Sequence, residues 1–405
     1  MASRTASRFL HDSRSSQLSR IGCSGKHNDY ATEGVFTMKD RVVLFAEEDT
    51  MFRLMETALN GTPSPKALKS LRYFFGDNIE SQIEYLLSIP SLVGLPSGFQ
   101  GVVCEDEHSL PSLIPEADYL VCERAQIGFD LMVKGRDRLK LIQKLGTDYK
   151  NIDVKASKSL GIPVAYMRRI GSMSVGEHVM TLILALSRNL ILAHETAKKR
   201  KYATDGLLSA GPPRTKFNWG QVAGIQLVQG KKLGFVGFGE NATEVAMLAH
   251  RFGMQIVYYQ RHRASENREK MFDARYIPSL EQLVAEADFV SIHVPYGPPT
   301  EKMFNRKVLA KMKPTAFLIN ISRGGVIDED ALFETLSEKK ISGAALDVYR
   351  WEPVPSDAPL LDLDNILWTT HIAAGSGDSS LYGSRDIIAN IARVARGETP
   401  EYLVK

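Results

Sequence analysis

The sequence predicts an α/β protein with two doubly wound parallel sheets, and three observations carry this prediction. Apolar strand-like stretches and helical stretches alternate along most of the 405 residues, which is the pattern of parallel sheets covered by helices. An apolar strand at 232–236 runs into a glycine turn and then into a helix, as nucleotide-binding sheets do. The length suits two domains.

The glycine turn is the most informative local feature. Gly237 permits a tight turn that a Cβ would block, and Gly239 lets the backbone approach a pyrophosphate. Ala242 occupies the third position of the G-x-G-x-x-G/A pattern, where only close helix–strand packing is needed. The following helix offers free N–H groups and its positive dipole end. We therefore predict dinucleotide binding by this turn, with Glu240 and Asn241 included; an ordinary βα turn is the alternative.

Composition excludes several classes of protein. Charged residues make up 24% and hydrophobic residues 44% of the chain, as in ordinary globular enzymes. A net charge of +3 is too small to indicate a nucleic-acid partner. The three cysteines are scattered without metal-ligand spacing, which indicates reduced thiols and no metal site. The longest apolar run, at 179–186, is far shorter than the roughly 20 residues of a bilayer span, so we expect no membrane partner.

The first 38 residues read as a separate tail. They contain four arginines among many serines, few acids and no apolar periodicity. That composition suits a mitochondrial or plastid transit peptide, a disordered tail, or an over-long reading frame whose real start is Met38. We expect no catalytic role for residues 1–38, and a cytoplasmic protein unless they are a transit peptide.

The next part of the chain predicts a first sheet. Its apolar runs lie at 41–46, 101–104, 119–122 and 139–145. Between 61 and 100, helical patterns at Pro65–Phe75 and Asn78–Leu87 precede a Pro/Gly-rich loop at 90–98. This stretch is longer than a βα unit needs, so we treat it as an insertion of unknown purpose.

A helix follows that is apolar nearly all round. It is predicted from Ser174 to Arg188, with Ser174 as N-cap and Glu177 completing a capping box. Such a helix is expected to be buried between domains or subunits. We interpret His178, one turn into it, as a packed structural histidine.

The alternation then resumes regularly up to residue 371. Strands are predicted at 255–260, 289–294, 316–322, 343–349 and 366–371, and helices at 279–287, 305–312 and 328–339. Such regular alternation is what a doubly wound nucleotide-binding domain requires. A last amphipathic helix, 377–396, returns the chain to the first domain.

The end of the second strand of this domain bears on coenzyme choice. About 20 residues beyond the glycine turn, an NAD site places Asp or Glu on the ribose hydroxyls, but the position here holds Gln260. Gln260 carries no charge to repel a 2′-phosphate, and Arg261 and Arg263 can pair with it. We predict NADP(H), with NAD as the alternative. The non-functional explanation of these basic residues is a solvated turn on the surface.

Five motifs, occurring in the right order, resemble the D-isomer-specific 2-hydroxyacid dehydrogenases: LGFVGFGENA, ADFVSIHVPYGPPT, LINISRGGVIDEDAL, GAALDVYRWEP and THIAAG. The likeness runs from about 140 to 400, and the first hundred or so residues match poorly. It implies a Rossmann coenzyme domain, residues 172–371, inserted in a flavodoxin-like substrate domain, residues 39–171 plus 372–405. It also implies a homodimer.

The resemblance further implies an Arg–Glu–His catalytic set at Arg323, Glu352 and His371. A histidine can give a proton to the alkoxide that forms as hydride reaches a 2-oxo acid. A carboxylate beside it favours the imidazolium, and an arginine holds the substrate carboxylate and polarises the carbonyl. Asp347 is expected on the nicotinamide side or as support for the site.

A loop of the first domain is expected to hold the substrate. In the family, backbone amides of such a loop grip the substrate, and here the loop would be Glu123–Gln126. We therefore predict substrate contacts at Arg124 and Ala125. The arginine pair at 168–169 stays ambiguous.

The predicted function is hydride transfer between NAD(P)H and a small 2-oxo acid such as glyoxylate or hydroxypyruvate. One alternative is a dinucleotide-binding transcriptional corepressor of the C-terminal-binding protein type. Another is a formate dehydrogenase-like enzyme, but formate dehydrogenases pair the histidine with glutamine, and Glu352 departs from that pattern.

Overall fold

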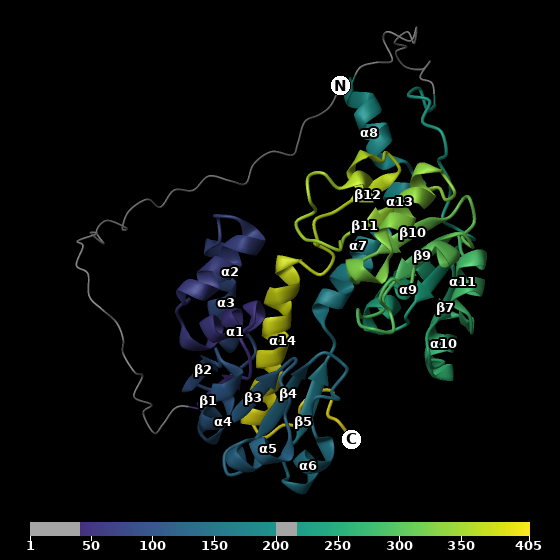
Figure 1. The fold of residues 1–405 in the computed structure, drawn as a ribbon. Helices are drawn as coiled ribbons and strands as arrows, with labels where there is room; N and C mark the ends of the chain where they lie inside the picture. Colours follow the sequence, from purple (N-terminus) through teal and green to yellow (C-terminus); the bar gives the residue numbers. More distant parts are fainter. Residues whose placement is uncertain (1–40, 200–216) are drawn as a thin grey trace, which may run out of the picture. The chain divides into compact units, whose positions relative to one another are not determined.

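The computed structural model describes residues 41–199 and 217–405. The predicted tail, with its suggested start at Met38, lies outside the described residues. Within them the chain forms two parallel sheets covered by helices (Figure 1). The prediction of two doubly wound parallel-sheet domains is confirmed.

The first sheet has five strands in the order β2-β1-β3-β4-β5, all parallel. The chain reverses its direction of strand addition once, between β1 and β3, which is the flavodoxin-like order. Strands β3 and β4 are buried at every position, as expected for strands covered on both faces. The strands are β1 (Arg41–Phe45), β2 (Phe99–Val103), β3 (Tyr119–Cys122), β4 (Leu141–Leu145) and β5 (Val164–Met167).

Helices from both ends of the chain cover this sheet. The last helix, α14 (Gly377–Ala395), packs against α1 and α3, so the chain returns to its first domain (Figure 1). The other helices are α1 (Thr50–Asn60), α2 (Pro65–Phe75), α3 (Glu80–Leu92), α4 (Leu110–Leu113), α5 (Phe129–Gly135) and α6 (Val154–Ser159).

The stretch between 61 and 100 differs from its prediction. Helix α3 continues through Pro90 to Leu92, where a loop was expected from residue 90. Leu86 and Ile89 are fully buried in the same core cluster as β1 and α1, so packing extends the helix past the proline. Helices α2 and α3 both pack on α1. The stretch is therefore part of the domain core.

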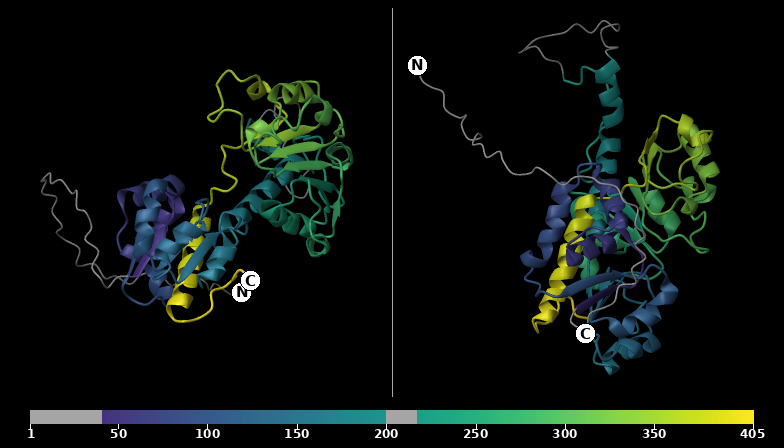
Figure 2. Two further views of the ribbon diagram at one scale, coloured as in Figure 1. Left: turned by 60° about the horizontal axis from the view of Figure 1, so that its bottom comes forward. Right: turned by 90° about the vertical axis from the view of Figure 1, so that its left-hand side faces the viewer.

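The second sheet has seven parallel strands in the order β12-β11-β10-β9-β6-β7-β8. Strands β6 to β8 extend one way and β9 to β12 the other, so the switch point lies between β6 and β9. Figure 2 shows the sheet with helices on both sides. Its strands are β6 (Lys232–Val236), β7 (Gln255–Tyr259), β8 (Ala274–Tyr276), β9 (Phe289–Ile292), β10 (Phe317–Asn320), β11 (Gly343–Leu346) and β12 (Ile366–Trp368).

The strands are shorter than predicted where the chain turns toward the site. The predicted strands at 343–349 and 366–371 end at Leu346 and Trp368, so the polar residues that follow stand in loops. The connecting helices are α9 (Glu240–Arg251), α10 (Glu266–Phe272), α11 (Leu280–Glu286), α12 (Arg306–Leu309) and α13 (Glu329–Ser337).

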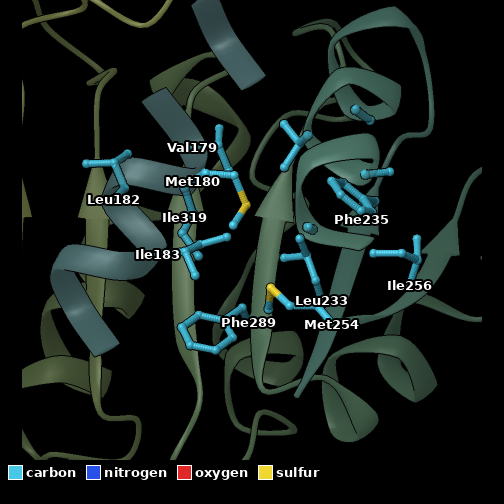
Figure 3. Packing of buried hydrophobic residues seen from close by; sticks show 14 of the residues in the cluster. Val179, Met180, Leu182, Ile183, Leu233, Phe235, Met254, Ile256, Phe289 and Ile319 are labelled. Carbon is cyan, nitrogen blue, oxygen red and sulfur yellow. The ribbon is translucent and has the colours of Figure 1, made fainter. Parts of the chain in front are cut away.

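The apolar helix α7 (Ile170–Ser187) begins four residues before its predicted start. Ser174 is therefore inside the helix, and the predicted N-cap is wrong; Arg169 precedes the helix and no side chain caps it. Val179, Met180 and Ile183 pack with Phe235 and other sheet residues in one core cluster (Figure 3). This contact explains the apolar sequence.

By length and composition alone, α7 would also qualify as a membrane span, although half of that window is buried inside the protein. The apolar run predicted from the sequence, 179–186, is only the second half of this helix. Burial against α9 and the sheet is what a core helix shows. Helix α8 (Leu190–Lys199) follows it.

Candidate active site

The glycine turn opens a pocket at the carboxyl edge of the second sheet. Gly237 has φ of 90°, and a Cβ there would lie 3.0 Å from the backbone of His293, so only glycine fits. A Cβ on Gly239 would meet nothing within 4 Å, which leaves room for a ligand beside the exposed backbone. Ala242, the third residue of α9, is fully buried. These features suit a pyrophosphate at the first turn of α9.

The pocket has a volume of about 510 Å³. It is lined by the glycine turn, the residues after β7, and the loop after β9, namely Gly237–Gly239, Tyr259–His262, His293–Gly297, Pro299, Thr300 and Met303. A pocket at the switch point of a doubly wound sheet is where such folds bind nucleotides. The residues present therefore fit a nicotinamide dinucleotide.

Two of the residues predicted to contact the coenzyme, Gln260 in the pocket lining and Arg263 outside it, have hydrogen-bond partners within the protein. The Oε1 atom of Gln260 accepts a hydrogen bond from the N–H of Phe238 at 3.1 Å. Arg263 donates two hydrogen bonds of 2.8 Å to the carboxylate of Glu269, and it does not line the pocket. The prediction that Arg263 binds the coenzyme does not match this placement. Arg261 does line the pocket.

Glu240 and Asn241 occupy the first turn of α9. The carboxylate of Glu240 accepts hydrogen bonds from the Thr147 hydroxyl at 3.1 Å and from the N–H of Arg169 at 2.9 Å. The carboxylate therefore does not face the dinucleotide position in this structure. Its negative charge would also repel a pyrophosphate. Asn241 is exposed on the helix.

Glu352 and His371 form a hydrogen-bonded pair. The Nδ1 atom of His371 lies 2.6 Å from Oε2 of Glu352, while Oε1 accepts the N–H of Tyr349 at 3.0 Å. Burial alone would raise the pKa of Glu352, but the hydrogen bonds from His371 and Tyr349, together with the charge of Arg323, lower it below its usual value. Glu352 is thus an ionised acceptor that fixes the imidazole with Nε2 left for a substrate.

Arg323 follows the neighbouring strand β10. The buried Asn320 shapes its loop, because Asn320 donates to the carbonyl of Arg323 at 3.0 Å and accepts the N–H of Ser322 at 3.0 Å. The exposed guanidinium donates from Nη1 to the carbonyl of Ser322 at 2.6 Å. Since β10, β11 and β12 are adjacent, the three predicted catalytic residues follow three neighbouring strand ends.

Asp347 is fully buried and supports the turn that carries His371. Its carboxylate accepts the Thr369 hydroxyl at 2.6 Å and the N–H groups of Ile372 and Ala373 at 2.9 Å each. His178 of α7 lies 3.5 Å away. Both carboxylate oxygens thus accept hydrogen bonds from the protein. Asp347 therefore supports the loop that carries His371, which is one of its two predicted roles. The other predicted role, contact with the coenzyme, does not fit its burial.

The predicted substrate loop is held differently from expectation. The carboxylate of Glu47, two residues past the end of β1, accepts the N–H groups of Glu123, Arg124 and Ala125, the last at 2.7 Å. The buried Lys144 donates to the carbonyls of Glu123 and Leu145. Three of the amides expected to grip the substrate, those of residues 123–125, are therefore bonded to Glu47 in this structure, and the predicted substrate contacts at Arg124 and Ala125 stay predictions.

The side chains of this loop differ in their exposure. The Arg124 guanidinium is 68% exposed and lies 3.9 Å from Asp49, so it remains available to an anion. Ala125 is buried. A polar residue placed directly after a strand is the signal that would have identified Glu47. His262 and Tyr296, both in the pocket lining, also escaped the prediction.

Comparisons with known proteins point to one family. A family model described as "D-isomer specific 2-hydroxyacid dehydrogenase, NAD binding domain" matches residues 180–373. The chain is 35% identical over 267 residues to the glyoxylate reductase of Korarchaeum cryptofilum, covering 66% of this chain and 76% of that one. It is 35% identical over 278 residues to the hydroxypyruvate reductase of Thermotoga maritima, covering 68% and 83%.

Longer relatives and solved structures are also similar. The chain is 35% identical over 291 residues to the D-3-phosphoglycerate dehydrogenase of Methanocaldococcus jannaschii, covering 72% of this chain but only 52% of that one. The chain thus spans about half the length of this relative. The D-mandelate dehydrogenase structure from Rhodotorula graminis aligns with a TM-score of 0.57 at 22% identity, covering 91% and 98%, which supports the fold.

Proposed function

The chain belongs to the D-isomer-specific 2-hydroxyacid dehydrogenase family, and from this premise we propose that it reduces a small 2-oxo acid to the corresponding D-2-hydroxy acid with a nicotinamide dinucleotide. The observation that carries the proposal is the 2.6 Å contact between His371 and Glu352 at the carboxyl edge of the coenzyme-binding sheet. Arg323 adds a cation at the adjacent strand end.

The proposed chemistry follows from these side chains. The bound reduced dinucleotide supplies a hydride to the carbonyl carbon. The protonated imidazole of His371 gives its Nε2 proton to the carbonyl oxygen as the C=O π bond breaks, and it recovers a proton from solvent afterwards. Glu352 stabilises the imidazolium before transfer. Arg323 holds the substrate carboxylate and stabilises charge that develops on the oxygen.

Glyoxylate and hydroxypyruvate are the substrates we favour. Several relatives of which this chain covers most of the length are named glyoxylate reductase or hydroxypyruvate reductase. The D-3-phosphoglycerate dehydrogenases are matched over only about half their length. The phosphorylated substrate of that reaction class belongs in the assay as a comparison.

We further propose that NADPH is preferred to NADH. Among the residues that the structure describes, none that lines the dinucleotide pocket is Asp or Glu. An acidic residue would accept the ribose hydroxyls of NADH and repel a 2′-phosphate. The lining instead contributes Arg261 and His262.

Two other functions compete with this proposal. A corepressor of the C-terminal-binding protein type would bind dinucleotide tightly without turnover. A formate dehydrogenase would oxidise formate and lack a carboxylate beside the histidine, whereas Glu352 occupies that place. The stretch between 61 and 100, a candidate peptide groove for the corepressor, is instead packed on α1.

The test is steady-state oxidation of NADPH and NADH with glyoxylate, hydroxypyruvate, phosphohydroxypyruvate and pyruvate, and reduction of NADP⁺ with formate. We expect turnover of glyoxylate or hydroxypyruvate, and a His371→Ala variant that loses at least about 100-fold in kcat because general acid catalysis is removed. Tight dinucleotide binding with no turnover of any 2-oxo acid would contradict the proposal, as would an active His371→Ala variant.

A homodimer is also proposed. Leu190, Ile191 and Leu192 at the start of α8 are each 55% exposed, and such a run of large apolar side chains favours a partner surface. Light scattering coupled to gel filtration tests this, and a monomer at micromolar concentration would contradict it. We place the enzyme in the cytoplasm, to be checked by locating a tagged full-length chain.

A further inference from the structure

We propose that a second pocket, separate from the dinucleotide pocket, binds a small quaternary ammonium cation. This aromatic pocket has a volume of about 250 Å³ and is formed by the loop between β11 and β12, by Trp368 of β12 and by Glu329 at the start of α13. It shares no lining residue with the dinucleotide pocket, and Arg323, Glu352 and His371 do not line it. The inference goes beyond the proposed reduction of a 2-oxo acid and does not depend on it.

Three aromatic rings line the aromatic pocket, those of Tyr349, Trp351 and Trp368. The rings of Tyr349 and Trp368 are stacked, with their centroids 5.4 Å apart and an angle of 19° between their planes. Trp351 is 65% exposed, so its indole is accessible to a ligand. The face of an aromatic ring attracts a cation, and tryptophan does so more strongly than tyrosine or phenylalanine.

Two carboxylates, those of Glu329 and Asp357, also line the aromatic pocket, and no basic residue among the described ones does. The Oε1 atom of Glu329 accepts the N–H of Arg350 at 2.8 Å. In the part of the chain that the structure describes, neither carboxylate lies within 4.0 Å of a basic side chain. A hollow lined by charge of a single sign concentrates its electric field, and here that field favours a cation.

The rest of the lining indicates which kind of cation fits. It is apolar and consists of Val354, Pro355, Ala358, Pro359 and Leu360. A primary ammonium carries three N–H donors that need acceptors, whereas a quaternary ammonium presents methyl groups that pack on apolar and aromatic surfaces. The volume of about 250 Å³ is below the roughly 300–1,000 Å³ of pockets that hold drug-sized ligands. A small, methylated head group is therefore the best match.

Much of the aromatic pocket is held in place by the protein itself. The Tyr349 hydroxyl donates to the carbonyl of Leu346 at 2.7 Å. The hydrogen bond from the N–H of Arg350 to Glu329 joins the loop to α13. The loop also lies directly on Gly324, where a Cβ would be 1.9 Å from the carbonyl carbon of Tyr349. Because these groups are already ordered, a ligand would bind with little loss of side-chain entropy.

The experiment compares three ligands that separate charge from shape. Choline carries a trimethylammonium group, neopentyl carbinol is its uncharged carbon analogue, and ethanolamine keeps the charge without the methyl groups. Calorimetry gives the dissociation constants for the full-length chain without coenzyme or substrate. Intrinsic fluorescence is a second readout, because two of the three tryptophans of the chain line the aromatic pocket.

The variants are Trp351→Ala, Trp351→Phe, Glu329→Gln and Asp357→Asn. Two matched controls remove the same kinds of group elsewhere. Tyr73→Ala removes an aromatic ring that is 83% exposed on α2, and Asp364→Asn removes an exposed carboxylate. Neither Tyr73 nor Asp364 lines the aromatic pocket. Circular dichroism checks that each variant is folded.

Choline is expected to bind with a dissociation constant of about 1 mM or lower, and about 10-fold more tightly than either analogue. Trp351→Ala should weaken choline binding about 3- to 30-fold, since a cation–π contact is lost, and Trp351→Phe should weaken it less. Glu329→Gln and Asp357→Asn should each weaken it by a smaller factor. The two controls should leave it unchanged. If Trp351→Ala does not fold, the contrast of Trp351→Phe and Asp357→Asn with the controls still decides.

Four results would overturn the inference. They are the absence of choline binding, equal affinity for neopentyl carbinol, equal affinity for ethanolamine, and choline binding that is unchanged in every variant of the lining. The outcome for the proposed function is read separately, because these titrations contain no 2-oxo acid. A chain that turns over no substrate and yet binds choline would leave the inference standing.

Discussion

Replacing Asp347 with asparagine tests how the turn around the catalytic histidine is held. The variant keeps the size of the side chain but replaces one acceptor oxygen with an amide donor. In the wild type the two oxygens receive the Thr369 hydroxyl and the N–H groups of Ile372 and Ala373. The new amide would therefore face at least one buried donor, an arrangement that costs about 1–3 kcal/mol.

The magnitude also follows from the ionisation of Asp347. Burial alone would raise the pKa of this carboxyl, but hydrogen bonds from His178, Thr369, Ile372 and Ala373 outweigh burial and lower the pKa from 3.8 to about 2. At 1.36 kcal/mol per pKa unit, the ionised form contributes about 2 kcal/mol to folding. Because the folded pKa is the lower one, this contribution is complete above about pH 4 and is lost as the pH falls through about 2.

Urea unfolding of wild type and Asp347→Asn measures this contribution. We expect the variant to be less stable by about 2 kcal/mol at pH 7, and the difference to shrink to about half near pH 3. The exposed Asp364→Asn is the matched control and should change stability by less than about 0.5 kcal/mol. The turn also carries His371, so kcat of Asp347→Asn should fall about 10- to 100-fold.

One result would refute the reasoning. If Asp347→Asn unfolds with the same free energy as the wild type at pH 7, the buried carboxylate does not hold the turn. A loss of stability that stays constant between pH 7 and pH 3 would show that packing, and not ionisation, is responsible.

Three further changes test other parts of the molecule. Glu352→Gln should lower kcat about 100-fold with intact stability, because the histidine loses its carboxylate partner; an unchanged kcat in steady-state assays would contradict this role. Glu47→Gln should lower the unfolding free energy by about 1–3 kcal/mol, since the carboxylate accepts three backbone N–H groups, and equal urea midpoints would count against it. Gly324→Ala should prevent folding or destabilise by more than about 3 kcal/mol, because the new Cβ would lie 1.9 Å from the carbonyl carbon of Tyr349. Gly128→Ala, where a Cβ meets nothing within 4 Å, is its control, and circular dichroism should distinguish the two.

The pair of Glu352 and His371 shows how much of the site could be predicted from the sequence. The family motifs placed Glu352 and His371 at the carboxyl edge of one sheet, and the structure puts them 2.6 Å apart. The residues at which the strands end, and the surroundings of the side chains that follow, were harder to predict. Asp347 was expected at the end of a strand, either on the nicotinamide side or as support for the site, and it is buried in a loop that it helps to close. Burial of a carboxylate depends on donors 22–26 residues away, which no local pattern encodes.

The sequence by itself determined the two parallel sheets, the glycine turn and the family. The reason is that strand alternation, turn glycines and motif order are local properties of the chain. Only the tertiary structure decided which ionisable side chains are free to meet a ligand. It pairs Arg263 with Glu269 and leaves Arg261 in the pocket, and it fills the amides of Glu123–Ala125 with Glu47. The partner of a charged group is set by packing between distant segments, so adjacent residues of the same charge acquire different roles.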